Sequence, residues 1–182
     1  MAFRTFDDIN RPEWKAALKI YHQAFPAPGR KPDRILEGMF AKRLSFLHTE
    51  SEDGEVLAMA VTGRVPKAEL LLIDYLAVRE DVRGRGYGRR FVRDIETWAR
   101  DRMKLAGLLI EAEADPGEAN AERIRFWERC GFVLTDYVHE YIWVPETYRA
   151  MYRMFEPGFR AQDGGRALFR HIEEFHKKAF AR

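Results

Sequence analysis

The sequence predicts an α/β fold of the α+β type, in which helices flank a central, mostly antiparallel sheet of about seven strands and an extra helix follows at the C-terminus. Three observations favour this class. The expected elements run in the order strand, two helices, three strands, helix, strand, helix, two strands and helix. One central strand is continuously apolar, as a strand buried on both faces is. Only two helices serve as crossovers between strands, which favours a mixed sheet over a doubly wound one.

The N-terminal elements are a short strand at Phe3–Phe6 and a helix from about Arg11 to Phe25, where apolar residues recur every three or four positions. Asn10 is the expected N-cap of this helix, and Pro12 suits its first turn. The prolines and the glycine of "FPAPGRKP" then form a loop. A second helix is expected over Asp33–Lys42.

A hairpin and a buried strand follow. The segment "LSFLHTESEDGEVLAMAVTGRV" is typical of two strands joined by a turn at Glu52–Glu55, where Asp53 and Gly54 supply the positive φ angles that tight turns need. The segment Glu69–Val78, "ELLLIDYLAV", is too continuously apolar for a surface strand. Asp74 interrupts it, and a carboxylate in such a strand needs a partner. A structural hydrogen bond is favoured for Asp74 over a functional role.

The second half of the chain alternates helices and strands. Helices are expected over Arg89–Met103 and Glu118–Cys130, and Gly131 is placed as a left-handed C-cap of the latter. A tail helix is expected over Gly165–Ala179. The strands predicted in this half are Gly107–Ala114, 132–138 and Tyr148–Phe155, the last as the antiparallel neighbour of 132–138.

Length and composition indicate one domain. A chain of 182 residues is too short for two comfortable domains with a linker, so we expect one domain over 1–182, with a core of 1–156 and a helical extension of 157–182. Hydrophobic residues make up 46% and charged residues 33%, the balance of a globular protein in water. No apolar run reaches the roughly 18 to 20 residues that span a bilayer. The N-terminus lacks a signal-peptide core, so a cytoplasmic location is expected.

Cysteine, histidine and charge exclude several function classes. Cys130 is the only cysteine, which excludes an internal disulfide and a metal site built on paired cysteines. His171 and His176 lie five positions apart on the tail helix, the wrong spacing for a shared face, and no metal is predicted. The net charge is +2, from 31 basic and 29 acidic residues, so the chain lacks the field of a dedicated nucleic-acid binder. Its positive charge is local and is expected to attract a small anion.

That charge lies where a buried strand runs into "VREDVRGRGYGRRFV", a glycine-rich turn that opens a helix. The first amides of a helix lack acceptors within it, and the helix dipole adds about half a positive charge there. Gly84, Gly86 and Gly88 leave room for a pyrophosphate, and neighbouring arginines complete the charge balance. The dinucleotide pattern G-x-G-x-x-G and the Walker pattern are both absent from the sequence. The turn therefore indicates the phosphates of another coenzyme.

Two motifs in order resemble those of the GNAT family of N-acetyltransferases. "LAVREDVRGRGYGRRFV" is similar to the family's acetyl-coenzyme A motif, an apolar strand followed by Arg/Gln-x-x-Gly-x-Gly/Ala, which is matched by Arg83, Gly86 and Gly88. "NAERIRFWERCGF" is similar to the family's Asn-x-x-Ala-x-x-Phe-Tyr-x-x-x-Gly-Phe. This second motif is matched by Asn120, Phe126, Gly131 and Phe132, whereas Arg123 and Trp127 depart from it.

The resemblance implies a sheet splayed between its fourth and fifth strands, with acetyl-coenzyme A as co-substrate in the gap. It implies that the pantetheine pairs with backbone near Leu76–Val78 and that the pyrophosphate lies on the amides of Arg83–Gly88. The residues that it assigns to coenzyme binding are Leu76, Ala77, Val78, Arg83, Gly84, Arg85, Gly86, Tyr87, Gly88, Arg89, Asn120, Phe126 and Trp127.

Acetyl transfer to an amine needs groups that move protons. Alkyl amines titrate near about 10.4, so a base must deprotonate the acceptor. Glu111 and Glu113, two apart on a strand, point to one face and are the candidate bases; a solvent-facing strand edge is the equal alternative. The family's usual proton donor to sulfur is a tyrosine, and here Trp127 holds that position with an indole that cannot donate. Tyr137 is the candidate acid and Tyr141 the second, although packing roles are favoured for both.

The resemblance and the residues together predict an acetyl-coenzyme A dependent N-acetyltransferase acting on a primary amine by direct transfer. The expected partners are an amine, on a small molecule rather than a protein, and a second copy of the chain; no nucleic acid and no membrane are expected. The loop "FPAPGRKPDR" is expected to line the acceptor site, where Arg30 and Arg34 could bind a carboxylate. Two alternatives stay open: a non-catalytic acyl-coenzyme A binding domain, favoured by Trp127, and a nucleic-acid binder.

Overall fold

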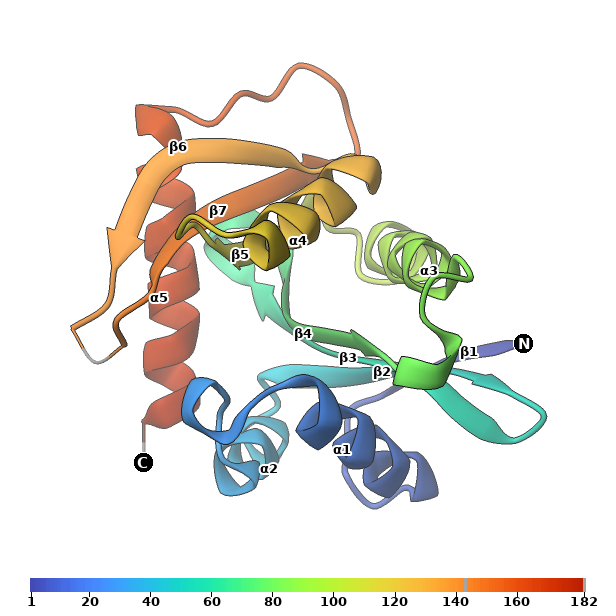
Figure 1. Cartoon of the computed structure of the whole chain (residues 1–182). Coiled ribbons are helices and arrows are strands. Elements are labelled where there is room, and N and C mark those ends of the chain that lie inside the picture. The colour runs from blue at the N-terminus through green and yellow to red at the C-terminus, as the bar shows by residue number, and fades with distance from the viewer. Residues whose placement is uncertain (143, 182) are drawn as a thin grey trace. The chain divides into compact units, whose positions relative to one another are not determined.

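The computed structural model describes residues 1–142 and 144–181, which form two compact units (Figure 1). The N-terminal unit comprises Met1–Arg64, Ile73–Ile95 and 178–181, and the C-terminal unit comprises Val65–Leu72 and Glu96–Lys177. Each unit has its own strands, helices and buried core. The single domain expected over 1–182 stays a prediction, and its last residue lies outside the described residues.

The elements confirm the predicted fold class and order. The strands are β1 (Ala2–Phe6), β2 (Ser45–Glu52), β3 (Glu55–Val65), β4 (Leu70–Val78), β5 (Gly107–Glu113), β6 (Val133–Glu140) and β7 (Thr147–Met154). The α-helices are α1 (Pro12–Ala24), α2 (Asp33–Ala41), α3 (Tyr87–Asp101), α4 (Glu118–Arg129) and α5 (Arg166–Phe180). Over the described residues, the strands follow one another in the order β1-β2-β3-β4-β5-β7-β6 and form a mostly antiparallel sheet. Within the same residues, no helix combines the length and the apolar character needed to cross a bilayer.

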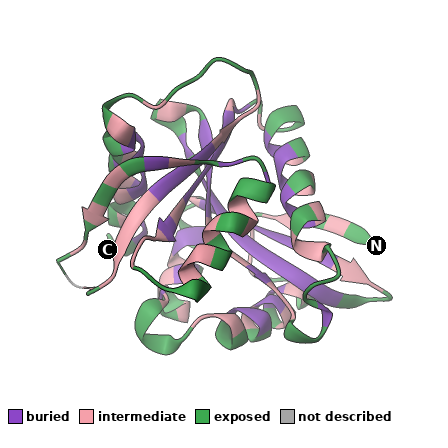
Figure 2. Cartoon of the chain, turned by 45° about the horizontal axis from the view of Figure 1, so that its top comes forward, coloured by how far each residue is buried: buried purple, intermediate pink, exposed green. Residues whose placement is uncertain are grey.

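The hairpin of the N-terminal unit has the predicted turn. Asp53 and Gly54 join β2 to β3 with φ angles of +50° and +83°, the positive values that an Asp-Gly pair accommodates. β2 pairs antiparallel with both β1 and β3. β3 is buried along almost its whole length, as Figure 2 shows by its continuous buried colouring. The hairpin therefore supplies the core strand of this unit.

The start of α1 differs from the prediction by one residue. Arg11, in an extended conformation, is the N-cap, and its side chain makes no capping hydrogen bond. The prediction of Asn10 as N-cap was wrong, because Asn10 belongs to the preceding turn, where its backbone N–H donates to Asp8 Oδ1 at 2.8 Å. Pro12 begins the helix as predicted, since its fixed φ suits the first helical position.

A histidine lies in the core of the N-terminal unit. His48 of β2 is fully buried, and its ring nitrogens lie 2.9 Å from Thr5 Oγ1 and 2.8 Å from Thr62 Oγ1. The ring of Phe3 stacks on it with centroids 5.6 Å apart. Burial lowers the pKa of His48 to about 3, so the folded protein holds this imidazole in its neutral form.

We expect His48 to make the fold sensitive to acid. The unfolded chain binds a proton at this histidine near its ordinary value of 6.5, whereas the folded chain binds it only near 3, so its contribution to stability is complete above pH 6.5 and is lost as the pH falls toward 3. Urea unfolding between pH 7 and 4 measures the effect. The free energy of unfolding of His48→Gln should fall less steeply than that of the wild type, and parallel curves would contradict the assignment.

The C-terminal unit contains β6 and β7, the two strands predicted to be antiparallel neighbours. β7 pairs antiparallel with both β5 and β6, and Leu70–Leu72 of β4 pair parallel with Gly107–Leu109 of β5. Gly131 follows α4 with a φ of +86°, as its position after the helix predicted. In Figure 1, α5 runs behind β6 and β7. Its residues Phe169 and Ile172 are completely buried, so the tail helix is part of the core of this unit.

Candidate active site

The glycine-rich turn connects the end of β4 to the start of α3 in the N-terminal unit. Gly84 and Gly86 have φ angles of +78° and +84°, a left-handed conformation that costs other residues roughly 1–2 kcal/mol. A Cβ atom placed on either glycine would meet no other atom within 4 Å. The backbone conformation, and not crowding inside the chain, therefore requires these glycines, and space is left beside the turn.

The start of α3 adds backbone donors to this turn. The helix begins at Tyr87, two residues before the predicted start at Arg89, because the turn already adopts helical geometry there. Its first helical hydrogen bond joins the N–H of Arg90 to the carbonyl of Gly86 at 3.2 Å. The amides of Tyr87, Gly88 and Arg89 come before this bond and have no acceptor within the helix. With the helix dipole, they form a suitable site for an anion.

Two arginines next to the turn are bound to carboxylates and stabilise its position. Arg79 donates to Asp81 at 2.7 and 2.9 Å and to Glu55 at 2.8 Å, which ties the end of β4 to the hairpin. Arg90 donates from Nε to Glu50 Oε1 at 3.0 Å. Burial raises the pKa of Glu50, and the charge of Arg90 offsets part of this rise. These two arginines therefore serve the local structure.

The other arginines of the turn are exposed. Arg83, Arg85 and Arg89 all lie at the surface. Arg83 donates from Nε to the carbonyl of Val78 at 3.0 Å, which holds its side chain beside the end of β4. Arg85 and Arg89 form no ion pair with any described residue. These three arginines are those predicted to contact phosphate, and their charge is available to a ligand.

The remaining predicted residues of this unit contribute differently. Ala77 is buried in β4, while Leu76 and Val78 are half-buried, so the backbone is the part of this strand end that a ligand can pair with. Tyr87 directs its hydroxyl to the hairpin, where it donates to Glu52 Oε2 at 3.1 Å. The part of Tyr87 that can donate to an anion at the turn is therefore its backbone amide.

The predicted residues of the second motif lie on α4 in the C-terminal unit. Asn120 donates from Nδ2 to the carbonyl of Asp115 at 3.0 Å and closes the turn before the helix. Trp127 packs edge-on against Phe126 and Phe132, with ring centroids 5.1 and 5.0 Å away. Each side chain thus has a structural contact within its unit. A coenzyme contact from Asn120, Phe126 or Trp127 stays a prediction.

Glu111 of β5 is the centre of a polar cluster in the C-terminal unit. Tyr141 donates from its hydroxyl to Glu111 Oε2 at 2.8 Å, and His176 Nε2 lies 2.7 Å from Glu111 Oε1. The side chains of Glu111 and His176 are only 21% and 14% exposed, so the carboxylate is largely shielded from water. Burial, and then the charge of Glu111, raises the pKa of Tyr141, which therefore stays protonated at neutral pH. We call Glu111, Tyr141 and His176 the Glu111 cluster.

Glu113 faces the same side of β5 but has a different partner. Glu113 lies opposite Tyr148 of β7. The pKa of Tyr148 is raised, mainly by its burial and then by the negative charges of Glu111 and Glu113. Arg123 donates to Glu113 Oε2 at 2.7 Å. Because this guanidinium balances its charge, Glu113 is the weaker candidate base of the two, and its role stays a prediction.

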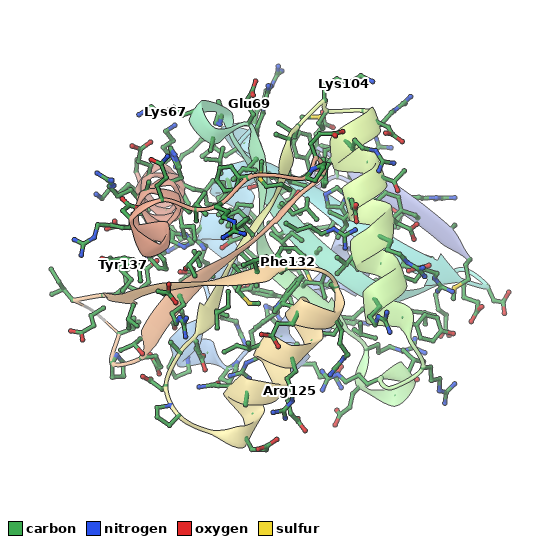
Figure 3. All side chains as sticks on the ribbon, turned by 90° about the horizontal axis from the view of Figure 1, so that it is seen from above. Lys67, Glu69, Lys104, Arg125, Phe132 and Tyr137 are labelled. Carbon is green, nitrogen blue, oxygen red and sulfur yellow. The ribbon has the colours of Figure 1, made fainter. Side chains whose placement is uncertain are left out.

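Tyr137, the first candidate acid, lies on β6 beside α5, as Figure 3 shows. Its hydroxyl is 3.3 Å from Nδ1 of His139, and its ring packs against Phe169 and beneath the guanidinium of Arg166, which is 4.6 Å from the ring centroid. These are the contacts of a packing aromatic with a polar tip. The hydroxyl that reaches Glu111 belongs to Tyr141, the second candidate, while the role of Tyr137 stays a prediction.

Asp74 has the hydrogen-bonding partner that its position in β4 required. Lys31 Nζ lies 2.7 and 2.9 Å from the two carboxylate oxygens of Asp74, and the two side chains are only 7% and 2% exposed. The carbonyl of Lys31 accepts a hydrogen bond from Tyr21, and its N–H donates to the Tyr75 hydroxyl. The predicted hydrogen bond of Asp74 is therefore confirmed, and it fastens the loop before α2 to β4.

The two arginines of this loop are placed differently. Arg30 donates to the carbonyl of Phe25 at 2.7 Å and lies over the ring of Tyr21, 5.8 Å from its centroid. Arg34 is exposed on α2. Arg30 thus shapes the loop, and a contact of either arginine with an acceptor carboxylate stays a prediction.

Two side-chain contacts of the candidate site and its surroundings had no signal in the sequence. His176 comes 65 positions after Glu111, and Lys31 comes 43 positions before Asp74. Neither pair falls within a motif or shares a helix or strand. The histidine spacing on the tail helix also gave no reason to select His176. Only the packing of α5 on the strands brings it to Glu111.

Comparison with known proteins places the chain among the acetyltransferases. A sequence model described as the acetyltransferase (GNAT) family matches residues 14–132, more than half of the chain. The chain belongs to the GNAT family, as its two motifs predicted.

Individual solved structures share the fold of this chain. A protein of Bacteroides thetaiotaomicron assigned to the GNAT family superposes with a TM-score of 0.74 at 17% identity and covers 97% of each chain. An acetyltransferase of Bacillus subtilis, solved with coenzyme A, has a TM-score of 0.61 at 14% identity, covering 85% of this chain and 98% of its own. An uncharacterised protein of Dictyostelium discoideum is 31% identical over 116 residues, which are 61% of this chain and 26% of that protein. The chain thus spans about a quarter of that relative's length.

Proposed function

We propose that this protein transfers the acetyl group of acetyl-coenzyme A to a primary amine by direct transfer. The observation that carries the proposal is the turn between β4 and α3, where glycines at positive φ, free helix amides and exposed arginines occur together. Hydrogen bonds to charged groups contribute about 1.5 to 3 kcal/mol each. Four or five of them contribute about 6 to 15 kcal/mol before ordering costs, a range that includes the roughly 8 kcal/mol of micromolar binding. Family membership and the coenzyme A bound to the Bacillus subtilis neighbour support the donor.

In the proposed reaction, the nitrogen of a neutral amine attacks the carbonyl carbon of the thioester. The C–N bond forms, the C–S bond breaks, and coenzyme A leaves as a thiolate that takes up a proton. Glu111 accepts the proton lost by the amine, directly or through water. Tyr141 supplies the proton to the thiolate and regains one from protonated Glu111, with Tyr137 as the alternative donor. The net result moves the amine proton to sulfur without Trp127.

The acceptor that fits this chemistry is an alkyl amine on a small molecule. Such an amine arrives as an ammonium ion, which the carboxylate of Glu111 attracts, and its first proton passes through Glu111 to the solvent before the neutral nitrogen attacks. The rings of Tyr141 and Tyr148 lie edge to face with centroids 5.5 Å apart and offer aromatic surface to a cation. The proposal includes no metal and no nucleic-acid partner.

Acetyl-coenzyme A is expected to bind and stabilise the wild-type protein, and Gly86→Glu is expected to weaken this binding by about 10- to 100-fold or more, since it removes one or two charge-assisted contacts and adds a negative charge. Calorimetric titration measures the dissociation constant, and thermal unfolding with and without the coenzyme gives a second measure. Failure of acetyl-coenzyme A to bind the wild type would overturn the proposal.

Gly54→Glu is the matched control. Gly54 has a φ of +83° against +84° for Gly86, and a Cβ atom on either meets nothing within 4 Å, so both variants carry similar backbone strain. Gly54→Glu should lose stability like Gly86→Glu but keep the wild-type affinity. Coenzyme binding without amine-dependent thiol release, across a panel of amines, would favour the non-catalytic acyl-coenzyme A binding domain. Steeply salt-dependent DNA binding that the coenzyme leaves unchanged would favour the nucleic-acid binder.

A further inference from the structure

We propose that His176 of α5 is a positioning residue for Glu111, which makes the tail helix part of the catalytic machinery. The inference rests on the proposed function, in which Glu111 accepts the amine proton, and goes beyond it by assigning a role to a residue outside the region that the family sequence model matches. The observation that carries it is the distance of 2.7 Å between His176 Nε2 and Glu111 Oε1 in a largely shielded site.

The contact defines which atom carries the proton. An ionised carboxylate can only accept hydrogen bonds, so Nε2 of His176 is the donor while Glu111 is ionised. Tyr141 donates to the other oxygen at 2.8 Å, so each carboxylate oxygen of Glu111 has a donor on it. The two donors therefore fix the plane of the carboxylate.

The packing of α5 holds both partners of Glu111 in place. Phe169 and Phe175 bury one face of the helix in the unit, so the helix cannot rotate without exposing them. Phe169 stacks on His139 with centroids 4.3 Å apart and planes at 22°, and His139 packs edge-on against Tyr141 at 4.6 Å. The helix thus supplies His176 directly and positions Tyr141 through His139. A helix whose only role was to cover the sheet would require neither the His176 contact with Glu111 nor the Phe169 contact with His139.

The inference predicts an effect on turnover that separates it from a structural role. His176→Phe should lower kcat by about 10- to 100-fold, the loss that corresponds to one hydrogen bond to a charged group, and should change KM by less than about threefold. His176→Gln offers an amide donor to Glu111 and should recover most of kcat. Lys177→Gln, an exposed neighbour on the same helix, should match the wild type. Equal kcat in His176→Phe and the wild type would overturn the inference.

A second measurement works without turnover. In protein labelled with nitrogen-15, the Nε2–H of His176 should give an imidazole proton resonance that exchanges slowly with water, since Glu111 accepts it and the site is shielded. The resonance should disappear in His176→Gln and shift in Glu111→Gln. If a wild-type protein that acetylates amines lacks this resonance, the inference about His176 is overturned and the proposed function stands. A wild type that shows the resonance but acetylates no amine would overturn the proposed function, and with it the catalytic role of His176.

Discussion

Replacing Glu111 with glutamine is expected to lower kcat for amine acetylation by about 100- to 10,000-fold, the usual contribution of a positioned base. Glutamine has the shape of glutamate and can still accept a hydrogen bond from Tyr141, so the fold should be kept, but an amide cannot take up the amine proton. Steady-state kinetics with acetyl-coenzyme A and the best acceptor of an amine panel measure the loss. Raising the pH should recover part of it, because more of the amine is then already neutral.

Two other carboxylates of the same unit provide control variants for Glu111→Gln. Glu140 of β6 is exposed, and Glu140→Gln should retain wild-type kinetics. Glu113→Gln should lose much less than Glu111→Gln, because Arg123 already balances the charge of Glu113. A larger loss in Glu113→Gln than in Glu111→Gln would move the base to Glu113. Unchanged kcat in both variants would show that neither glutamate of β5 takes part in the proton transfer.

Replacing Lys31 with methionine is expected to lower the free energy of unfolding by about 3 to 5 kcal/mol, the usual loss when one partner of a buried ion pair is removed. The reason is that Asp74, only 2% exposed at its side chain, loses the ammonium group that contacts both of its oxygens. Methionine keeps most of the volume of the lysine stem, so the loss reports on charge more than on packing. Equilibrium unfolding in urea at pH 7 measures it.

Lys67→Met provides the matched control for this prediction. Lys67, labelled in Figure 3, also pairs with a carboxylate, that of Glu174, but the two side chains are 70% and 44% exposed. Such an exposed pair contributes about 0 to 1 kcal/mol. Adding Asp74→Asn to Lys31→Met removes the buried negative charge and should recover part of the loss. Similar losses in Lys31→Met and Lys67→Met would show that burial of the Lys31 pair has no energetic consequence.

Features that depend on neighbouring residues could be predicted from the sequence. The Asp53 and Gly54 turn, the glycine after α4 and the glycines before α3 all follow from the φ angles that their residue types allow. The order of elements followed from apolar periodicity. The boundaries were less accurate. Asn10 was wrongly chosen as a cap, because the path of the chain before the helix, and not the capping ability of the side chain, places Arg11 at the N-cap.

The candidate site also has one part that the sequence could predict and another that it could not. The phosphate-binding turn occupies one continuous segment, so its glycines and arginines could be selected from spacing and a motif. Its arginines could not be sorted into those that bind carboxylates, such as Arg79, and those that stay exposed, such as Arg85, because the partners of Arg79 include Glu55 on a different strand. The acid–base residues were selected only in part. Glu111 could be found by strand alternation, while nothing local distinguished Tyr141 from Tyr137.

The sequence alone thus determined the fold class, the position of the turn and the family motifs, because each depends on backbone preferences and residue types within one short segment. Tertiary structure alone decided that Lys31 neutralises Asp74 and that Tyr141 and His176 both reach Glu111. These contacts join residues that lie 43, 30 and 65 positions apart. They form because burying the apolar faces of strands and helices brings those segments together, and a polar group buried by that packing must then find its partner wherever the packing places one.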